Sequence, residues 1–219
     1  MKNKVLSAMV LVLGLSVTAG MADARGSSVE SGREKAAVCM GCHGQDGNSP
    51  ADLWPKIAGQ VPEYFIKQLL DFKAGRRVND QMAPLVEMLS EQDIRDLAAF
   101  FATQRASAVE EVADRKVAHG ERIYLKGAGR GPAAVTACVG CHGQRGEGSR
   151  NWSNVYVTPP AVLAPAIGSQ HPSYIAAQLR AYKARTRKND VGEVMRTIAS
   201  RMSDEEIEAV AAYVATLRP

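Results

Sequence analysis

The chain has 219 residues, of which 46% are hydrophobic and 23% charged, and its formal net charge is +4. Without a leader, this length is enough for one large domain or two small ones. The apolar run at residues 5–19 is shorter than the roughly 20 residues that a membrane-spanning helix needs. No later stretch could span a bilayer, so the sequence excludes an integral membrane protein once that run is removed.

Residues 1–24 have the features of a secretory signal peptide. Lys2 and Lys4 give a basic start, the apolar run follows, and Ala22 and Ala24 are small residues at the spacing that a signal peptidase reads. We expect cleavage after Ala24, because the run is too short for the alternative of an uncleaved anchor. The mature chain is then exported, which in a bacterium means the periplasm.

Two pentapeptides of the form Cys-x-x-Cys-His use every cysteine and two of the four histidines. They contain Cys39, Cys42 and His43 in the first copy, and Cys138, Cys141 and His142 in the second. Each thiol can form a thioether with a haem vinyl group, and the imidazole then lies beneath the iron. Two Cys-x-x-Cys pairs could instead bind zinc or form redox disulfides, but neither explains the repeated histidine. The sequence therefore predicts two covalently bound haem c groups.

The residues around the two pentapeptides also repeat. Residues 54–60 match 164–170, and the matches continue through the segments 62–73 with 172–183, 77–80 with 187–190, and 90–103 with 203–216. A repeat of this length indicates two homologous domains. We expect an N-terminal domain at residues 25–107 and a C-terminal domain at residues 108–219, joined within a polar stretch at residues 104–117.

The expected secondary structure is helical in both halves. Helices are predicted to lead toward the pentapeptides at residues 32–38 and 120–125, the second ending at the glycine-rich stretch 127–132. Residues 64–73 and 174–183 repeat apolar side chains at helical spacing. Ser90 and Ser203 each precede an acidic residue by three positions, which is typical of a capping box at a helix start. With no strand pattern, the fold class is all-α, with one small helical unit per haem.

The second axial ligand of each iron separates an electron carrier from a site that activates small molecules. Met82 and Met195 share a register, each eight residues before the serine of its capping box, and are our candidates; the alternative is that they fill gaps in the core. The other mature methionines do not repeat in this way, and they are Met40, Met88 and Met202. Nor do His119 and His171 have counterparts, so we expect neither to bind iron.

An iron-bound imidazole also needs an acceptor for its outer nitrogen. Pro55 and Pro165 hold matched positions after their pentapeptides, 12 and 23 residues beyond the histidine. Their carbonyl groups are our candidates for that acceptor, and simple loop termination is the alternative.

Taken together, these motifs resemble the dihaem cytochrome c4 family, which has two class I cytochrome c domains in tandem. The resemblance covers nearly all of the mature chain and rests on the two pentapeptides, the run at 55–60, Gln-Leu-x-x-Phe-Lys at 68–73, Arg-x-Asn-Asp at 77–80 and the methionine spacing. It implies a periplasmic electron carrier that feeds a terminal oxidase. The implied iron ligands are His43 with Met82 and His142 with Met195. An inserted segment at residues 149–163 departs from the family and puts the shape around the second haem edge in question.

The expected ligands suit electron transfer better than catalysis. Thioether sulfur is a soft, neutral ligand that favours ferrous iron, and keeping both ligands through the redox change leaves little to reorganise. A filled sixth position leaves no place for peroxide or oxygen, so we expect an electron carrier and no catalytic residue. The alternatives are a cytochrome subunit of a larger dehydrogenase or a dihaem peroxidase-like enzyme.

Charge is shared unevenly between the two halves. Residues 25–107 have 10 basic and 11 acidic side chains, whereas residues 108–219 have 15 and 11. Five basic residues cluster at one helix and the turn after it, and they are Arg180, Lys183, Arg185, Arg187 and Lys188. This cluster either docks an acidic partner or forms a solvated face with arginines near the haem propionates. The expected partners are redox proteins, a membrane-bound electron donor and a terminal oxidase, and no nucleic acid.

Overall fold

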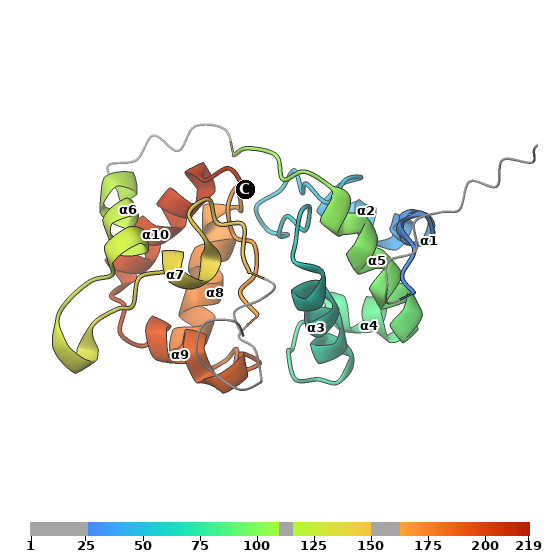
Figure 1. The fold of residues 1–219 in the computed structure, drawn as a ribbon. Coiled ribbons are helices and arrows are strands. Elements are labelled where there is room, and N and C mark those ends of the chain that lie inside the picture. The colour runs from blue at the N-terminus through green and yellow to red at the C-terminus, as the bar shows by residue number, and fades with distance from the viewer. Residues whose placement is uncertain (1–25, 110–115, 150–162) are drawn as a thin grey trace, which may run out of the picture.

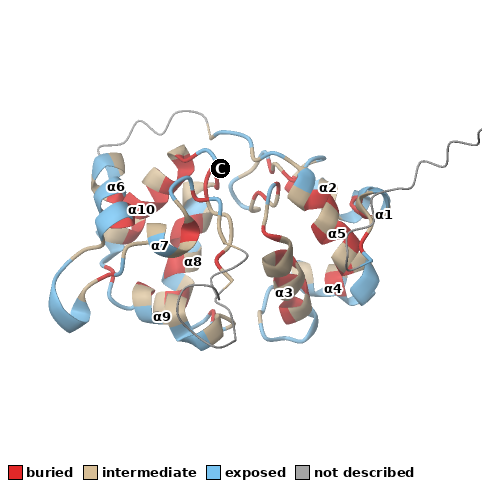
Figure 2. Cartoon of the chain, viewed as in Figure 1, coloured by how far each residue is buried: buried red, intermediate tan, exposed pale blue. Residues whose placement is uncertain are grey.

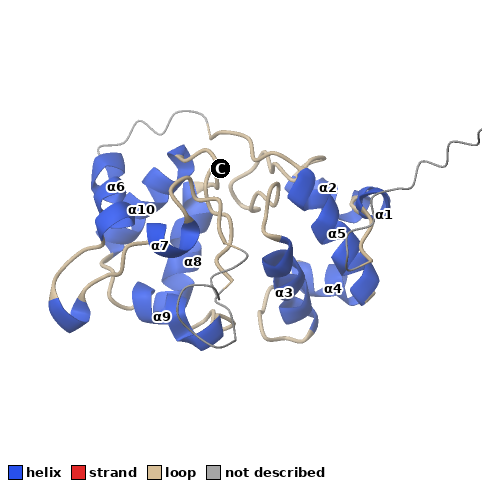
Figure 3. Cartoon of the chain, in the orientation of Figure 1, coloured by secondary structure: helices blue, strands red, loops and turns tan. Residues whose placement is uncertain are grey.

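The computed structural model describes residues 26–109, 116–149 and 163–219, and these residues form helices and isolated bridges but no strand (Figure 3). The fold is therefore all-α, as the sequence predicted. The predicted signal peptide and residues 150–162 of the inserted segment lie outside the described residues. None of the helices in the described ranges is long and apolar enough to cross a membrane.

The helices fall into two units that lie side by side (Figure 1). The N-terminal unit contains α1 (Val29–Lys35), α2 (Ala37–His43), α3 (Pro62–Lys73), α4 (Met82–Glu87) and α5 (Glu91–Thr103). The C-terminal unit contains α6 (Lys116–Lys126), η1 (Gly131–Ala133), α7 (Val139–His142), α8 (Pro172–Lys183), η3 (Val191–Glu193), α9 (Val194–Ala199) and α10 (Asp204–Thr216). The predicted helices are present, except that the one expected at residues 32–38 is divided at Ala36 between α1 and α2. The repeat in the sequence is therefore a repeat in the fold.

Capping and glycine residues set where the helices start and stop. Ser90 and Ser203 each accept a hydrogen bond from the third residue of their helix, whose carboxylate bonds back, so both predicted capping boxes form. Pro62 and Pro172 occupy the first turn of α3 and α8, where no intrahelical N–H bond is lost. The helix α6 ends before Gly127, which adopts a φ of 76° that few other residues tolerate.

The first and last helices of each unit cross at very short distance. A Cβ added to Gly32 of α1 would lie 2.0 Å from the Asp96 carbonyl oxygen of α5. At Gly120 of α6, it would lie 1.9 Å from the carbonyl oxygen of Ala209 in α10. Both crossings therefore require a glycine, and they hold the pentapeptide that follows α1 or α6 near the helix that ends the unit.

Each unit has a hydrophobic core of its own (Figure 2). In the N-terminal unit, Phe65 of α3 stacks on Phe101 of α5 with ring centroids 5.6 Å apart. In the C-terminal unit, Tyr124 is fully buried, and its hydroxyl donates a 2.5 Å hydrogen bond to the carbonyl of Gly143, directly after the second pentapeptide. Two separate cores with matched elements show two tandem domains of one kind.

Candidate functional site

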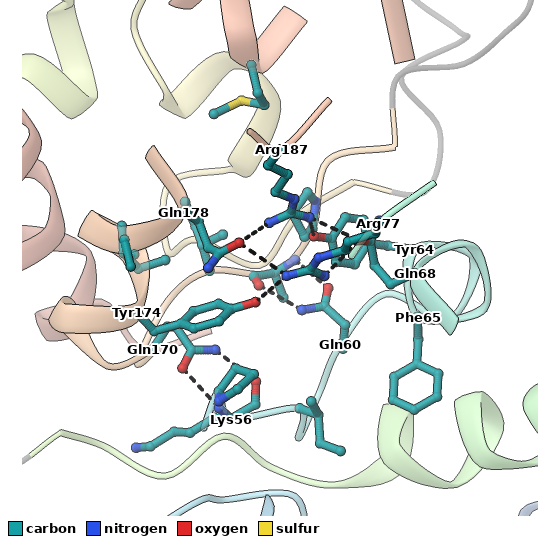
Figure 4. Close-up of a pocket in the computed structure, with 18 of the residues that line it drawn as sticks. Lys56, Gln60, Tyr64, Phe65, Gln68, Arg77, Gln170, Tyr174, Gln178 and Arg187 are labelled. Carbon is teal, nitrogen blue, oxygen red and sulfur yellow. Dashed lines mark hydrogen bonds between the residues drawn. The ribbon is translucent and has the colours of Figure 1, made fainter. Parts of the chain in front are cut away.

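A single cavity of about 640 Å³ opens through both units and is lined by both pentapeptides. Its walls are mostly apolar and come from matched elements, for example Phe65 and Leu69 of α3 and Leu179 of α8. Polar side chains concentrate where the two units meet, as the close-up shows (Figure 4). The cavity thus provides an apolar chamber beside each pentapeptide and a polar zone between the chambers.

The two pentapeptide histidines are buried and identically oriented. His43 and His142 expose 7% and 8% of their surfaces, and their Nδ1 atoms lie 2.8 and 2.9 Å from the carbonyl oxygens of Pro55 and Pro165. Burial lowers the pKa of both imidazoles, partly offset by these bonds to the carbonyls, so the neutral form is favoured. With Nδ1 held as a donor, Nε2 remains to bind a metal. The contacts expected for Pro55 and Pro165 are therefore present.

The four cysteines line the same cavity next to these histidines. Burial raises the pKa of Cys39 to about 11 and that of Cys138 to about 12, so neither is a thiolate at neutral pH. In the described ranges, no group of three or more His, Cys, Asp or Glu side chains could hold a metal ion. This arrangement gives no support to the zinc or thiolate-redox alternatives, and it leaves the thiols facing space that a haem would fill.

The structure places the two candidate methionines at the cavity and Met88 away from it. Met82 begins α4 and Met195 lies in α9; both line the cavity and pack against the core of their own unit. Met88, in contrast, is 72% exposed and is absent from the lining. Met202 is buried in the wall, where the N-terminal unit has Leu89, so it is an apolar wall residue that the sequence did not identify.

One buried polar atom at the cavity has no hydrogen-bond partner among the residues that the structure describes. The indole Nε1 of Trp54, next to Pro55, is buried and makes no hydrogen bond. A buried unsatisfied donor is costly, so such a group in a native protein points to a missing acceptor. A haem group in the chamber fits this observation, the apolar walls and the placement of the thiols and imidazoles. Ala164 holds the matched position in the C-terminal unit.

Two glutamines join the units by equivalent pairs of hydrogen bonds. Gln60 donates to the Ala166 carbonyl over 2.9 Å and accepts from the Ala166 N–H over 2.8 Å. Gln170, its counterpart, donates to the Lys56 carbonyl over 2.8 Å and accepts from the Lys56 N–H over 2.9 Å (Figure 4). The repeat in the sequence pairs these two glutamines but does not show that they bond across the interface; their repetition as polar residues in both halves was the available signal.

Two matched arginines reach across the same interface (Figure 4). Arg77 donates to the Tyr174 hydroxyl over 3.0 Å and to the Gln178 amide oxygen over 3.1 Å. Arg187 donates to the equivalent acceptors of the N-terminal unit, at 2.9 and 3.0 Å, which are Tyr64 and Gln68. The interface therefore has approximate two-fold symmetry, and these residues form four matched pairs of hydrogen bonds across it.

The basic cluster expected at residues 180–188 is not an open positive surface. Arg187 is 8% exposed and faces the N-terminal unit, so its inclusion in a docking surface was wrong. Three others are paired with acids, and the pairs are Arg180 with Glu208 at 2.5 Å, Lys183 with Asp204 at 2.8 Å and Arg185 with Glu193 at 3.2 Å. These ion pairs neutralise most of the positive charge of the cluster. The arrangement therefore agrees with the alternative of a solvated face rather than a docking surface.

The two remaining histidines do not line the cavity. His119 lies in α6. His171 precedes α8, and its Nε2 lies 3.1 Å from the Ser49 carbonyl oxygen of the other unit. Neither is placed to bind an iron in the chamber, as expected, but the interface contact of His171 was not foreseen.

Known proteins resemble this chain over almost all of its length. The cytochrome c family model matches residues 29–105 and 117–218. Cytochrome c4 of Pseudomonas aeruginosa is 39% identical, over 97% of this chain and 98% of its own. The thiosulfate dehydrogenase electron acceptor of Stutzerimonas stutzeri is 35% identical, over 95% of this chain and 92% of its own. The crystal structure of reduced recombinant cytochrome c4 from Pseudomonas stutzeri superposes with a TM-score of 0.77 at 35% identity, covering 88% of this chain and all of that one.

Proposed function

The chain belongs to the cytochrome c family and is a cytochrome c4-like electron carrier with two covalently bound haem c groups, and from this we propose that both irons have histidine and methionine ligands. The proposed pairs are His43 with Met82 and His142 with Met195. The observation that carries the proposal is that both members of each pair line the cavity from the same unit, at matched positions of the repeat. When bound, each haem supplies an iron that alternates between ferric and ferrous states.

The chain's own residues restrict that site to electron transfer. Pro55 and Pro165 fix the imidazole orientation through their carbonyls. A methionine at the sixth position would exclude oxygen and peroxide, and apolar walls would keep water from the iron. These features support a carrier of single electrons rather than a dihaem peroxidase.

Replacement of each methionine by alanine tests the ligand assignment. We expect Met82→Ala or Met195→Ala to open one of the two irons to carbon monoxide in the ferrous protein or cyanide in the ferric protein. The reduction potential of that haem should also fall, because the ferrous state loses its thioether ligand. The matched control is Met88→Ala, in which a 72% exposed side chain outside the cavity is removed. If Met82→Ala leaves spectrum and potential unchanged, the assignment fails.

We also propose that the mature protein works in the periplasm, after cleavage behind Ala24, and passes electrons toward a terminal oxidase. A second candidate is favoured by one similarity, namely the thiosulfate dehydrogenase electron acceptor named above. In that role the chain would accept electrons from a dehydrogenase. Stopped-flow reduction by a purified thiosulfate dehydrogenase, compared with oxidation by oxidase-containing membranes, separates the two. Fast oxidation without fast reduction supports the first role, and the reverse supports the second.

A further inference from the structure

One face of α3 forms hydrogen bonds with a turn of the other unit. Its residues occur at the spacing that places side chains on one side of a helix, and we call them the α3 clamp: Tyr64, Lys67, Gln68 and Asp71. The clamp binds the turn at residues 187–190, which precedes Met195. Besides the bonds to Arg187, the Asn189 amide donates to Gln68 over 3.0 Å and to the Asp71 carboxylate over 2.7 Å. Lys67 donates to the Asn189 carbonyl over 2.6 Å.

The α3 face makes five hydrogen bonds to the other unit, and the equivalent face of α8 makes only two. Tyr174 and Gln178 accept from Arg77, but Ala177 and Ala181 occupy the positions of Lys67 and Asp71. The counterpart of Asn189 is Asn79, whose side chain instead accepts hydrogen bonds from the Gln81 and Met82 N–H groups of its own unit, at 3.0 and 2.9 Å. The N-terminal unit therefore holds the methionine loop of the C-terminal unit, and the C-terminal unit does not hold its counterpart in this way.

Contacts within the C-terminal unit connect the gripped turn to Met195. Asp190, next to Asn189, accepts hydrogen bonds from the Arg196 N–H over 3.0 Å and from Arg196 Nε over 2.6 Å. Both side chains are largely buried, with 6% and 12% exposed, so this pair is shielded from solvent. Arg196 directly follows Met195 in α9. In the N-terminal unit, alanine occupies the position after Met82.

The loop between Asn189 and Arg196 has a strained backbone, which persists only if contacts hold both of its ends. Gly192 and Glu193 have φ values of 64° and 58°. A left-handed glutamate costs free energy, and such a conformation persists only where surrounding contacts impose it. The Asn189 contacts fix one end of this loop, and the Asp190–Arg196 pair closes it.

We propose that Lys67 and Asp71 are positioning residues for Met195: the N-terminal unit holds the 189–195 loop in the conformation that keeps this methionine at the C-terminal iron. The effect runs in one direction, because α8 has alanines where α3 has these two side chains. The inference rests on the proposed ligation by Met195. It assigns the N-terminal unit an influence on the C-terminal site that two independent domains would lack.

The test measures how fast cyanide displaces methionine at each ferric iron in the full-length holoprotein. The two irons are distinguished by NMR through the methyl signals of their bound methionines, assigned with the Met82→Ala and Met195→Ala variants. In Asp71→Ala and Lys67→Ala, we expect displacement to be roughly five- to thirtyfold faster at the C-terminal iron, the factor for losing one or two hydrogen bonds. The rate at the N-terminal iron should stay unchanged, although both substitutions lie in its own unit.

Two further variants separate this role from general weakening or a change of charge. Arg76→Ala removes a partner of Asp71, at 2.8 Å, whose hydrogen bonds among the described residues stay within the N-terminal unit, and it should leave both rates unchanged. Asp71→Asn keeps an acceptor for the Asn189 amide but removes the charge. If the hydrogen bond to Asn189, rather than the negative charge of Asp71, holds the loop, cyanide should displace the methionine more slowly in Asp71→Asn than in Asp71→Ala.

Three outcomes would contradict the positioning role of Lys67 and Asp71. Equal acceleration at both irons, acceleration at the N-terminal iron alone, or no change in folded Asp71→Ala and Lys67→Ala proteins overturns the positioning role. The assignment of Met195 as a ligand is tested separately, since it fails if Met195→Ala leaves the C-terminal iron closed to cyanide. If the C-terminal iron of Met195→Ala does not bind cyanide, the ligand assignment is wrong. If it does bind cyanide but the Lys67 and Asp71 variants behave like the parent protein, only the positioning role is wrong.

Discussion

At the scale of single residues, the interface contains a titratable side chain that only the C-terminal unit has. Val61 occupies the matched position of His171, whose ring bonds to the Ser49 carbonyl across the interface. Burial, the largest cause, lowers the pKa of His171 from its usual 6.5, and the charge of Lys56 lowers it further against opposing effects of Ser49 and Asp52. The neutral ring is therefore the form that the folded protein favours.

Folding stability should accordingly fall in mildly acidic solution. As the pH drops below the ordinary histidine pKa of about 6.5, the unfolded chain binds a proton at this position before the folded chain does. The loss continues down to the lower folded pKa and is absent above the ordinary value. His171→Gln keeps a donor for Ser49 without a titration, so its melting temperature should depend less on pH between about 7 and 5. Identical pH profiles for variant and parent would exclude this role.

Left-handed residues show how the two units differ in local detail. Ser169 and Arg185 have φ values of 60° and 59°, where the N-terminal unit has Gly59 and Gly75, both at 67°. Ser169 recovers some of the cost, because its fully buried hydroxyl donates a 2.7 Å hydrogen bond to the Leu217 carbonyl. No such buried contact holds Arg185, whose exposed pair with Glu193 contributes little.

At the scale of elements, the helix crossings at α1 with α5 and α6 with α10 support both pentapeptides. They are the two largest helix–helix contacts in the described residues. Each depends on a glycine against a backbone carbonyl, and a carbonyl in a helix cannot move aside as a flexible side chain can.

Alanine at either crossing should therefore be strongly destabilising. We expect Gly32→Ala and Gly120→Ala to lower the free energy of unfolding by about 1–3 kcal/mol or more, the range for overpacked cores. Gly41→Ala and Gly140→Ala are matched controls, because a Cβ at either position meets no atom within 4 Å. Chemical denaturation of the four holoproteins measures the difference. Equal stability of the crossing variants and their controls would mean that the helices separate without cost.

At the scale of the whole molecule, two domains are joined by matched polar contacts more than by packed helices. No pair of helices from different units is among the element pairs with substantial contact in the described residues. Instead, Gln60 and Gln170 each form two hydrogen bonds to the backbone of the other unit. The stability of the interface therefore depends on correctly oriented hydrogen bonds as well as on the burial of apolar surface.

Removing either glutamine should loosen the interface to a similar extent. Gln60→Ala and Gln170→Ala each remove two interdomain hydrogen bonds, a loss of about 2 kcal/mol at about 1 kcal/mol each. We expect the double variant to slow electron transfer between the two irons, because a looser interface holds the chambers at a less constant separation. Pulse radiolysis measures this rate, and the exposed Gln144→Ala provides the control. An unaltered rate in a double variant with lowered stability would show that transfer does not depend on these bonds.

The haem chemistry and the two-domain repeat could both be predicted from the amino-acid sequence. Cys-x-x-Cys-His specifies haem attachment because covalent bonds and an adjacent ligand need only local spacing, and capping serines specify helix starts for the same reason. The register shared by Met82 and Met195 likewise singled them out from Met88, and both line the cavity.

How the two units meet could not be predicted from the sequence and is visible only in the folded chain. Gln60 and Arg77 bond to residues about 100 positions away, and their own neighbours in the sequence do not indicate such partners. The sequence placed Arg187 in a basic surface, because charge alone does not show which side of a turn is buried. The hydrogen bonds from Lys67 and Asp71 to Asn189 likewise depend on how the two folded units are oriented, which no local pattern in the sequence specifies.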